Sequence, residues 1–246
     1  MLTAIIIYMN PRTLEILQAV IREFIDSGEP VSSRKLCRKC DFGVKDATIR
    51  NELNRLTEEE YLGQPHTSSG RVPTDKGYRF LVEQVMADLI GGLEFETEKS
   101  LSFLKEEFAR QEFDEFVGDF AEELELLGVG YAPESREVYK SGLDELFSYF
   151  VSDYEISEPR ELFQIVKDFE MLDERMSNLM NFISQNSSPR VFIGKSPITR
   201  SPELSVIADR FEMNGEPFVL AAIGPKRMDY EKNLRFFKQL REIINR

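Results

Sequence analysis

The order of patterns in residues 10–80 restricts the fold more than any other part of the chain. Three stretches with helical spacing of apolar residues follow one another closely, and a strand–turn–strand pattern comes next. Pro11 suits the first turn of the first helix, and Gly28 suits its end, because glycine tolerates the left-handed backbone found there. Ser32 or Ser33 is the expected cap of the second helix. These elements in this order predict a winged helix-turn-helix, whose usual partner is duplex DNA.

The third helix is expected over residues 46–59, and its two sides differ in chemistry. At 100° per residue, Ile49, Leu53 and Leu56 fall on one side and predict a buried stripe. The opposite side carries small, amide and guanidinium side chains instead of the mixed Glu and Lys of an ordinary solvated face. Asparagine can pair with adenine, alanine can contact the thymine methyl group, and arginine can bind guanine or phosphate. The residues expected to read DNA bases are Ala47, Thr48, Arg50, Asn51, Asn54 and Arg55.

The predicted hairpin after this helix carries basic and hydroxyl side chains. One strand begins at Tyr61 and Leu62, Val72 lies in the returning strand, and residues 67–70 form the tip. A wing of this kind contacts phosphates or the minor groove, where arginine is favoured. The residues expected to contact the DNA backbone, from the second helix, the wing and the exit helix, are Ser33, Arg34, His66, Thr67, Ser69, Arg71, Lys76 and Arg79.

Charge is distributed unevenly along the chain. The net charge of −13 argues against a DNA-binding protein at first sight, but residues 9–82 hold 12 Lys and Arg against 11 Asp and Glu. Residues 93–127 hold 3 basic and 12 acidic residues. An acidic C-terminal region joined to a near-neutral DNA-binding domain would keep the protein away from non-specific DNA. A solvated helix face also explains the acidic stretch, and the two interpretations are compatible.

The rest of the chain predicts an α+β body. We expect a lead-in at residues 1–9, the winged helix at 10–82, a helical connector at 83–127 and a mixed domain at 128–246. The connector shows one long apolar stripe of Leu and Phe, with a possible hinge at Gly91-Gly92. Asn214-Gly215 fits a tight turn between the last two strands. Strands are expected at 129–132, 190–193, 204–211 and 218–223, and further helices at 143–151, 161–183 and 230–244.

Catalytic, metal-binding and membrane functions find little support. Cys37 and Cys40 form a lone C-x-x-C, which suits a redox pair, half a zinc site or, as we favour, two small side chains packed within the second helix. His66 is the sole histidine and has no partner that suggests catalysis. No apolar run reaches the roughly 18 residues that cross a bilayer, and residues 2–8 lack the features of a signal peptide. We expect a cytoplasmic protein without cofactor, metal or enzymatic activity.

Three ordered strings in the N-terminal region resemble one known family. Residues 28–34 read Gly-Glu-Pro-Val-Ser-Ser-Arg, and residues 47–52 read Ala-Thr-Ile-Arg-Asn-Glu. Residues 64–79 contain Gln-Pro-His-Thr-Ser, then Gly-Arg-Val-Pro-Thr, then Lys-Gly-Tyr-Arg. Together these strings make the region similar to the N-terminal domain of the heat-inducible transcription repressor HrcA. Residues 191–195 and 222–230 resemble the same family.

The resemblance implies a function and a fold for the whole chain. Members of this family bind an inverted-repeat operator as dimers and repress chaperone genes, and the GroEL chaperonin supports their activity. Their C-terminal part has a GAF-like fold with an inserted dimerisation subdomain. The resemblance therefore implies a homodimeric repressor of heat-shock genes. The alternative is a winged-helix protein-interaction module that does not bind DNA sequence-specifically.

The chain departs from the family pattern at two places. Lys45 and Asp46 stand where the family has small hydroxyl residues at the start of the recognition helix. Between Ala132 and Arg136 the chain passes almost directly from one matching block to the next, so most of the inserted subdomain is lacking and the GAF-like domain is reduced. A replacement dimer contact is then needed. We assign it to the acidic, phenylalanine-rich residues 93–127, through Phe113 and Phe116.

Overall fold

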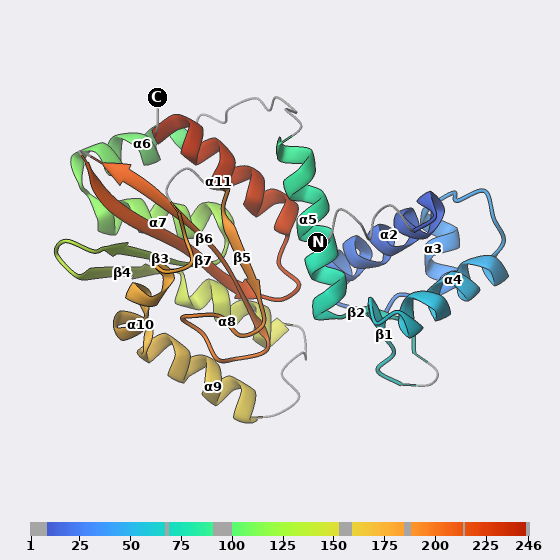
Figure 1. The fold of residues 1–246 in the computed structure, drawn as a ribbon. Coiled ribbons are helices and arrows are strands. Elements are labelled where there is room, and N and C mark those ends of the chain that lie inside the picture. Colours follow the sequence, from blue (N-terminus) through green and yellow to red (C-terminus); the bar gives the residue numbers. More distant parts are fainter. Residues whose placement is uncertain are drawn as a thin grey trace. The chain divides into compact units, whose positions relative to one another are not determined.

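The computed structural model describes residues 9–66, 69–90, 100–152, 159–184, 188–213 and 215–244 (Figure 1). The chain divides into two compact units, Met1–Gln84 and Val85–Arg246. The expected lead-in at residues 1–8, the expected hinge at Gly91-Gly92 and Asn214 of the expected turn lie outside the described residues. None of the described helices is long and apolar enough to cross a membrane.

The first unit contains three helices, a two-stranded antiparallel sheet and the start of an exit helix. These elements are α2 (Pro11–Ser27), α3 (Ser33–Lys39), α4 (Asp46–Glu58), β1 (Leu62–Gly63), β2 (Val72–Pro73) and α5 (Asp75–Ile90). The side chain of Asn10 caps α2 by accepting a hydrogen bond from a first-turn amide, and Gly28 ends α2 in the left-handed conformation, with φ of +65°. Ser32, the first of the two expected candidates, caps α3 by accepting a hydrogen bond from the Lys35 amide.

The buried side of α4 agrees with the predicted stripe. Ile49, Leu53 and Leu56 are all buried, and α4 packs against both α2 and α3. Thr13 of α2 donates a hydrogen bond from Oγ1 to Glu52 Oε2 at 2.9 Å, which adds a polar link between α2 and α4. Burial of the apolar stripe leaves the opposite side of α4 in solvent, which is the side expected to carry function.

A backbone bridge fixes the returning strand of the hairpin to the α2–α3 linker. The Val31 N–H donates to the Arg71 carbonyl oxygen, and the Arg71 N–H donates to the Val31 carbonyl oxygen, both at 2.8 Å. Gly70 lies against this bridge so closely that a Cβ there would come within 2.5 Å of the Val31 carbonyl carbon. Only glycine fits at residue 70 without displacing backbone, so the base of the hairpin has a defined position.

The second unit is built on a five-stranded antiparallel sheet with the order β4-β3-β7-β6-β5. The strands are β3 (Leu127–Ala132), β4 (Glu137–Ser141), β5 (Arg190–Ile193), β6 (Leu204–Met213) and β7 (Glu216–Pro225). The β6–β7 hairpin is the longest, since its pairing runs from Leu204 opposite Pro225 to Met213 opposite Glu216. The four predicted strands are confirmed, and β4 is an additional strand that the sequence did not predict.

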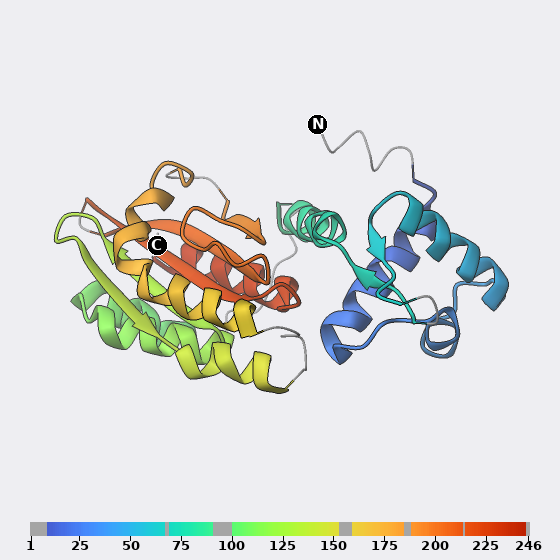
Figure 2. The same ribbon diagram turned by 90° about the horizontal axis from the view of Figure 1, so that it is seen from below.

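Helices cover both faces of this sheet (Figures 1 and 2). They are α6 (Ser100–Arg110), α7 (Phe113–Leu124), α8 (Leu143–Ser152), α9 (Pro159–Glu170), α10 (Leu172–Leu179) and α11 (Tyr230–Ile244). On one face, α6, α7 and α11 bury a cluster of phenylalanines, in which Phe108 lies 5.5 Å from Phe218 between ring centroids. On the other face, α8, α9 and α10 pack on Val129, Val206 and Ala221. Alternating side chains of the strands supply both cores, and the predicted α+β class is confirmed.

The prediction of one long helix over residues 83–127 is wrong. Helix α6 ends at Arg110 and α7 begins at Phe113, because Gln111 adopts the left-handed conformation with φ of +64°. The apolar stripe continues across this break because both helices face the same sheet.

The structure contradicts Phe116 as a dimer contact. Phe116 is fully buried, and Phe113 stacks on Phe218 of β7 with 4.5 Å between ring centroids. Phe116 therefore belongs to the core of its own chain and is not available to a second copy, whereas Phe113 is half-buried.

Candidate nucleic-acid interface

The exposed side of α4 carries the residues expected to read bases. Ala47, Arg50, Asn51, Asn54 and Arg55 are exposed, and Thr48, in the first turn, is half-buried. The helix therefore presents a methyl group, two amides and two guanidinium groups together to solvent. Such a surface combines the donor, acceptor and apolar contacts that base edges offer in a major groove.

Both arginines on this side form ion pairs within their own helix segment. Arg50 Nη2 lies 2.9 Å from Asp46 Oδ2, and Arg55 Nε lies 2.8 Å from Glu59 Oε1. The two pairs have the i, i+4 spacing that places side chains next to each other on a helix. Asp46 does not cap α4, because Lys45 occupies the cap position, without a side-chain hydrogen bond, and Asp46 pairs with Arg50 instead.

Arg71 connects the hairpin to α4. Its Nε donates to Thr57 Oγ1 at 2.9 Å, and its Nη2 donates to Asn54 Oδ1 at 2.8 Å. Burial lowers the pKa of the Arg71 guanidinium from its usual value, but an arginine stays protonated in a protein. The contact orients the amide of Asn54, so one residue of the exposed side is held in place by the hairpin.

The tip of the hairpin is organised by Ser69. Its Oγ accepts a hydrogen bond from the His66 amide at 2.9 Å, and its own amide donates to the His66 carbonyl oxygen at 2.9 Å. His66 is exposed, whereas Thr67 lies outside the described residues. The described part of the tip therefore forms a closed turn with the imidazole in solvent.

The remaining predicted contact residues differ in accessibility. Arg34 and Arg79 are exposed, but Ser33 is buried, because Ser32 takes the cap position and turns Ser33 toward the interior. Lys76 donates from Nζ to the Glu59 carbonyl oxygen at 2.7 Å and lies 4.2 Å from the centroid of the Tyr61 ring. Lys76 thus satisfies a carbonyl group at the C-terminal end of α4, where a cation is favourable.

Two sets of interactions that stabilise the first unit were not predicted from the sequence. Thr57 accepts the hydrogen bond that fixes Arg71, and no local pattern in the sequence indicates this pairing. Glu23 of α2 is buried and pairs with Lys35 at 2.9 Å and Lys39 at 2.6 Å. Burial opposes ionisation of Glu23, but the two lysines outweigh it and hold its pKa below the usual value. These pairs attach α3 to α2 and occupy the ammonium groups of both lysines.

The favoured interpretation of the C-x-x-C motif is wrong. Cys37 is exposed and Cys40 is half-buried, and both are free thiols. The cause is the short length of α3, in which Leu36 takes the single buried apolar position. Among the described residues, no group of three or more potential metal ligands is close enough to hold an ion.

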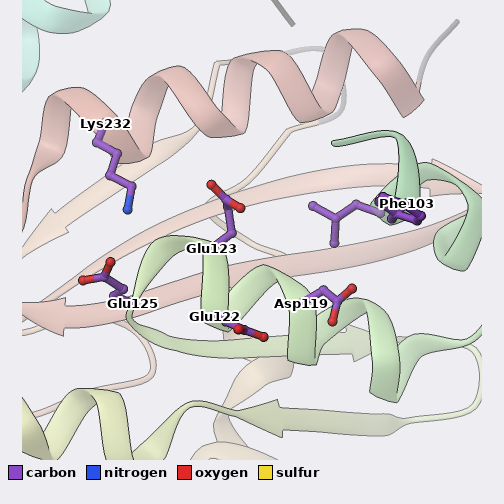
Figure 3. A pocket seen from close by; sticks show the side chains of 7 residues that line it. Phe103, Asp119, Glu122, Glu123, Glu125 and Lys232 are labelled. Atoms are coloured by element: carbon purple, nitrogen blue, oxygen red, sulfur yellow. The ribbon is translucent and has the colours of Figure 1, made fainter. Parts of the chain in front are cut away.

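The second unit contains a cavity of about 480 Å³ with an acidic lining (Figure 3). It lies among α6, α7 and α11, and its lining residues are Phe103, Leu104, Asp119, Glu122, Glu123, Glu125 and Lys232. Four carboxylates against one ammonium group repel phosphate at neutral pH. The candidate nucleic-acid interface is therefore the exposed side of α4 with the hairpin, and not this cavity.

Comparison with protein families identifies the chain. The family model described as HrcA protein C terminal domain matches residues 82–234, which is more than half of the chain. The chain belongs to the HrcA family. The match covers the body, so it is independent of the N-terminal strings that first suggested the resemblance.

Curated relatives in the HrcA family match the chain over part of its length. The heat-inducible transcription repressor HrcA of Thermoanaerobacter sp. (strain X514) is 42% identical over 113 residues, which is 46% of this chain and 32% of that protein. The protein of the same name from Acetivibrio thermocellus (strain ATCC 27405) is 52% identical over 79 residues, which is 32% of this chain and 22% of that protein. The matched stretches thus span about a third or less of these relatives.

A solved structure shares the overall fold. It is described as the crystal structure of a hypothetical protein at 2.2 Å resolution, and it aligns with a TM-score of 0.67 at 18% identity. The alignment covers 96% of this chain and 97% of that chain. At this identity the likeness shows the fold alone.

Proposed function

We propose that the chain is a DNA-binding transcription repressor of heat-shock chaperone genes that binds an inverted-repeat operator as a homodimer. In this proposal residues 10–82 are a winged helix-turn-helix, α4 is the recognition helix and the hairpin is the wing. The body is a reduced GAF-like domain that carries no catalytic activity. The protein acts in the cytoplasm.

One observation carries the proposal, namely the polar side of α4 together with the wing that is attached to it. Asn51 is exposed near the middle of α4, and Asn54 is oriented by Arg71. A helix that enters a major groove uses such side chains for hydrogen bonds to base edges. The residues that we propose for base contacts are Ala47, Thr48, Arg50, Asn51, Asn54 and Arg55.

Contacts to the DNA backbone would come from the regions on either side of α4. Arg34 and Arg79 are exposed. Their positive charges can attract phosphate groups without a specific alignment to base edges in a groove. His66 and Ser69 lie at the wing tip, and the exposed imidazole of His66 offers a donor for phosphate oxygens. Lys76, Arg71 and Thr67 complete the proposed set, and the buried Ser33 can contribute only after a local rearrangement.

The proposal includes regulation by a chaperone. The curated relatives are named as heat-inducible repressors, and we infer that this chain responds to heat in the same way. The partner in that response would be the GroEL chaperonin, whose availability would set the fraction of active repressor.

Fluorescence anisotropy with labelled DNA tests the proposal. The duplexes are an inverted repeat taken from upstream of the chaperonin genes of the source organism, a single half-site, and a scrambled sequence, each measured over a series of salt concentrations. We expect the full repeat to bind most tightly, with a steep fall in affinity as salt rises, because each phosphate contact releases counterions. Equal binding of repeat and scrambled duplex, with and without GroEL, would favour the protein-interaction module instead.

Asn51→Ala tests the base-reading role of α4. It should weaken operator binding by about 1–3 kcal/mol and relax the preference at one base position. Asn181→Ala is the matched control, because Asn181 is an equally exposed asparagine in the second unit. A loss of affinity that is the same for operator and scrambled DNA would remove Asn51 from the base-reading residues.

A further inference from the structure

One side of helix α9 packs into the core of the second unit, and the opposite side faces away from that core. Ile165 is buried in the core, and the buried carboxylate of Asp168 accepts hydrogen bonds from Arg175 Nη1 at 2.9 Å and from two backbone amides, those of Arg200 and Ser201, at 2.7 Å each. These contacts fix the orientation of α9 about its own axis. The side that faces away from the core is therefore a stable surface.

That outer side carries three large apolar side chains and the exposed Lys167. Phe163 is 69% exposed, Leu162 is 39% exposed and Val166 is 38% exposed. Three large apolar side chains on one exposed helix face form a contiguous patch and not isolated surface residues, and a patch of this kind marks a site of association. In the part of the chain that the structure describes, these three side chains remain open to solvent.

The sequence of the outer side is arranged symmetrically. Four exposed residues, Arg160, Phe163, Lys167 and Glu170, lie on the side of α9 that faces away from Ile165, with spacings of three, four and three residues. The order of spacings is the same in both directions. When a second α9 is placed antiparallel on the first, Phe163 of one copy therefore meets Val166 and the methylene stem of Lys167 of the other, and the reverse contact is identical. A surface with this property suits a two-fold axis.

Charge at the two ends of α9 selects the same arrangement. Arg160 lies in the first turn and Glu170 is the last residue of the helix, and both are exposed. Antiparallel pairing brings Arg160 of each copy to the level of Glu170 of the other, whereas parallel pairing would bring like charges together. Opposite charges at both ends fix the register and exclude the parallel alternative.

We propose that the outer side of α9, formed by Leu162, Phe163 and Val166 between Arg160 and Glu170, is the surface on which a second copy of this chain docks about a two-fold axis. This surface replaces the contact that we had assigned to Phe113 and Phe116. The inference deepens the proposed function. Its DNA-binding test rests on that function, since an inverted repeat is bound by two DNA-binding domains.

The size of the surface sets the strength of the dimer. A helix of 12 residues is about 18 Å long, so the contact covers a few hundred Å² on each copy. This is well below the roughly 800 Å² per partner of a standard stable interface. The free protein is therefore a weak dimer that dissociates on dilution, and operator DNA drives pairing because two adjacent half-sites raise the effective concentration of the second copy.

Sedimentation velocity over a series of protein concentrations tests the surface directly. The wild type should shift from monomer to dimer as concentration rises, and Phe163→Glu should weaken the association by about 30-fold or more, as expected for a central apolar contact. Phe103→Glu is the matched control, because Phe103 is a phenylalanine of similar exposure, 65%, on α6. A wild type that stays monomeric at all concentrations, or equal association of both variants with the wild type, would overturn the proposal.

Charge reversal separates pairing from folding. Arg160→Glu and Glu170→Arg each place two like charges together, so each should weaken the dimer, and the double variant should restore it. Both substitutions suit the helix dipole, because they put an acid at the N-terminus and a base at the C-terminus of α9. Weaker dimerisation of either variant therefore cannot result from unfolding of α9. Failure of the double variant to recover association would contradict the antiparallel register.

DNA binding distinguishes the failure of this inference from failure of the proposed function. Phe163→Glu should bind a half-site as the wild type does and should lose the additional affinity for the full repeat. Normal affinity of Phe163→Glu for the full repeat would overturn the α9 surface while leaving the repressor proposal standing. Absence of half-site and full-repeat binding in the wild type would instead refute the proposed function, and sedimentation would still decide the surface.

Discussion

The bridge between Val31 and Arg71 makes a single substitution in the hairpin informative. Gly70→Ala adds a Cβ that would lie 2.5 Å from the Val31 carbonyl carbon and 2.6 Å from the Pro30 carbonyl carbon and the Val31 nitrogen. All three are backbone atoms, so no side-chain rotation can make room. The linker and the strand must separate, and both hydrogen bonds of the bridge are then lost.

The magnitude follows from those two hydrogen bonds. Each backbone hydrogen bond contributes about 1 kcal/mol net, so the bridge contributes about 2 kcal/mol to the attachment of the hairpin. Opening of the bridge should then become roughly 30-fold more frequent. Hydrogen exchange measured by NMR at the Val31 and Arg71 amides reports this opening directly, since each amide donates to the other residue.

Gly63→Ala provides the matched comparison in the same hairpin. A Cβ at Gly63 would have its nearest neighbour, the Val72 side chain, at 3.6 Å, which is an ordinary van der Waals distance. This change should leave the protection of both amides within a few-fold of wild type, because a compatible Gly-to-Ala substitution shifts stability by less than about 1 kcal/mol. Unchanged protection in Gly70→Ala, or equal losses in both variants, would refute the reasoning.

Two further predictions concern the body and the thiols. Burial of Asp209, opposed by its ion pair with Arg241, raises the pKa of the carboxyl group to about 6. Because the folded pKa exceeds the unfolded value, the stability contributed by protonated Asp209 is present below about pH 4 and is lost as pH rises through 6. Relative to wild type, Asp209→Asn should therefore gain up to about 3 kcal/mol in the free energy of unfolding between pH 4 and 7. Urea titrations at several pH values measure this difference. If the free energies of unfolding of the two proteins changed with pH in parallel, the prediction would be contradicted. Cys37 should react with a disulfide reagent in the folded protein, because its thiol is exposed, and reaction only after denaturation would show that the thiol is buried.

The sequence predicted those elements whose residues follow a local rule. Helix α4 begins and ends within one residue of its expected bounds, and its buried and exposed sides are those that the 100° rotation per residue requires. Helix α11 has the expected bounds, Tyr230–Ile244. In both cases an apolar stripe and the flanking polar residues carry enough information, because the same residues that define the helix also define its buried side.

The sequence failed where tertiary contacts decide the structure. The stripe of residues 83–127 continues through a helix break at Gln111, since both helices pack on one sheet, and periodicity alone cannot show such a break. The helix expected at residues 161–183 is likewise divided near Met171 into α9 and α10. The link from Arg71 to Thr57 and Asn54 joins residues 14 and 17 positions apart, so no local pattern predicts it. The base-reading role of α4 and the backbone contacts of the wing stay predictions.

The ion pairs on α4 have a consequence for the thermodynamics of association. In the free protein, Asp46 and Glu59 already act as counterions to Arg50 and Arg55. In the proposed complex each arginine exchanges a carboxylate for a DNA group, and the released carboxylate remains beside a polyanion. Contact with a phosphate alone then gives little net gain, whereas a bidentate contact with guanine offsets the exchange. Random DNA would attract α4 less than its arginine content suggests, and fewer solution cations would be released than the number of arginines in contact implies.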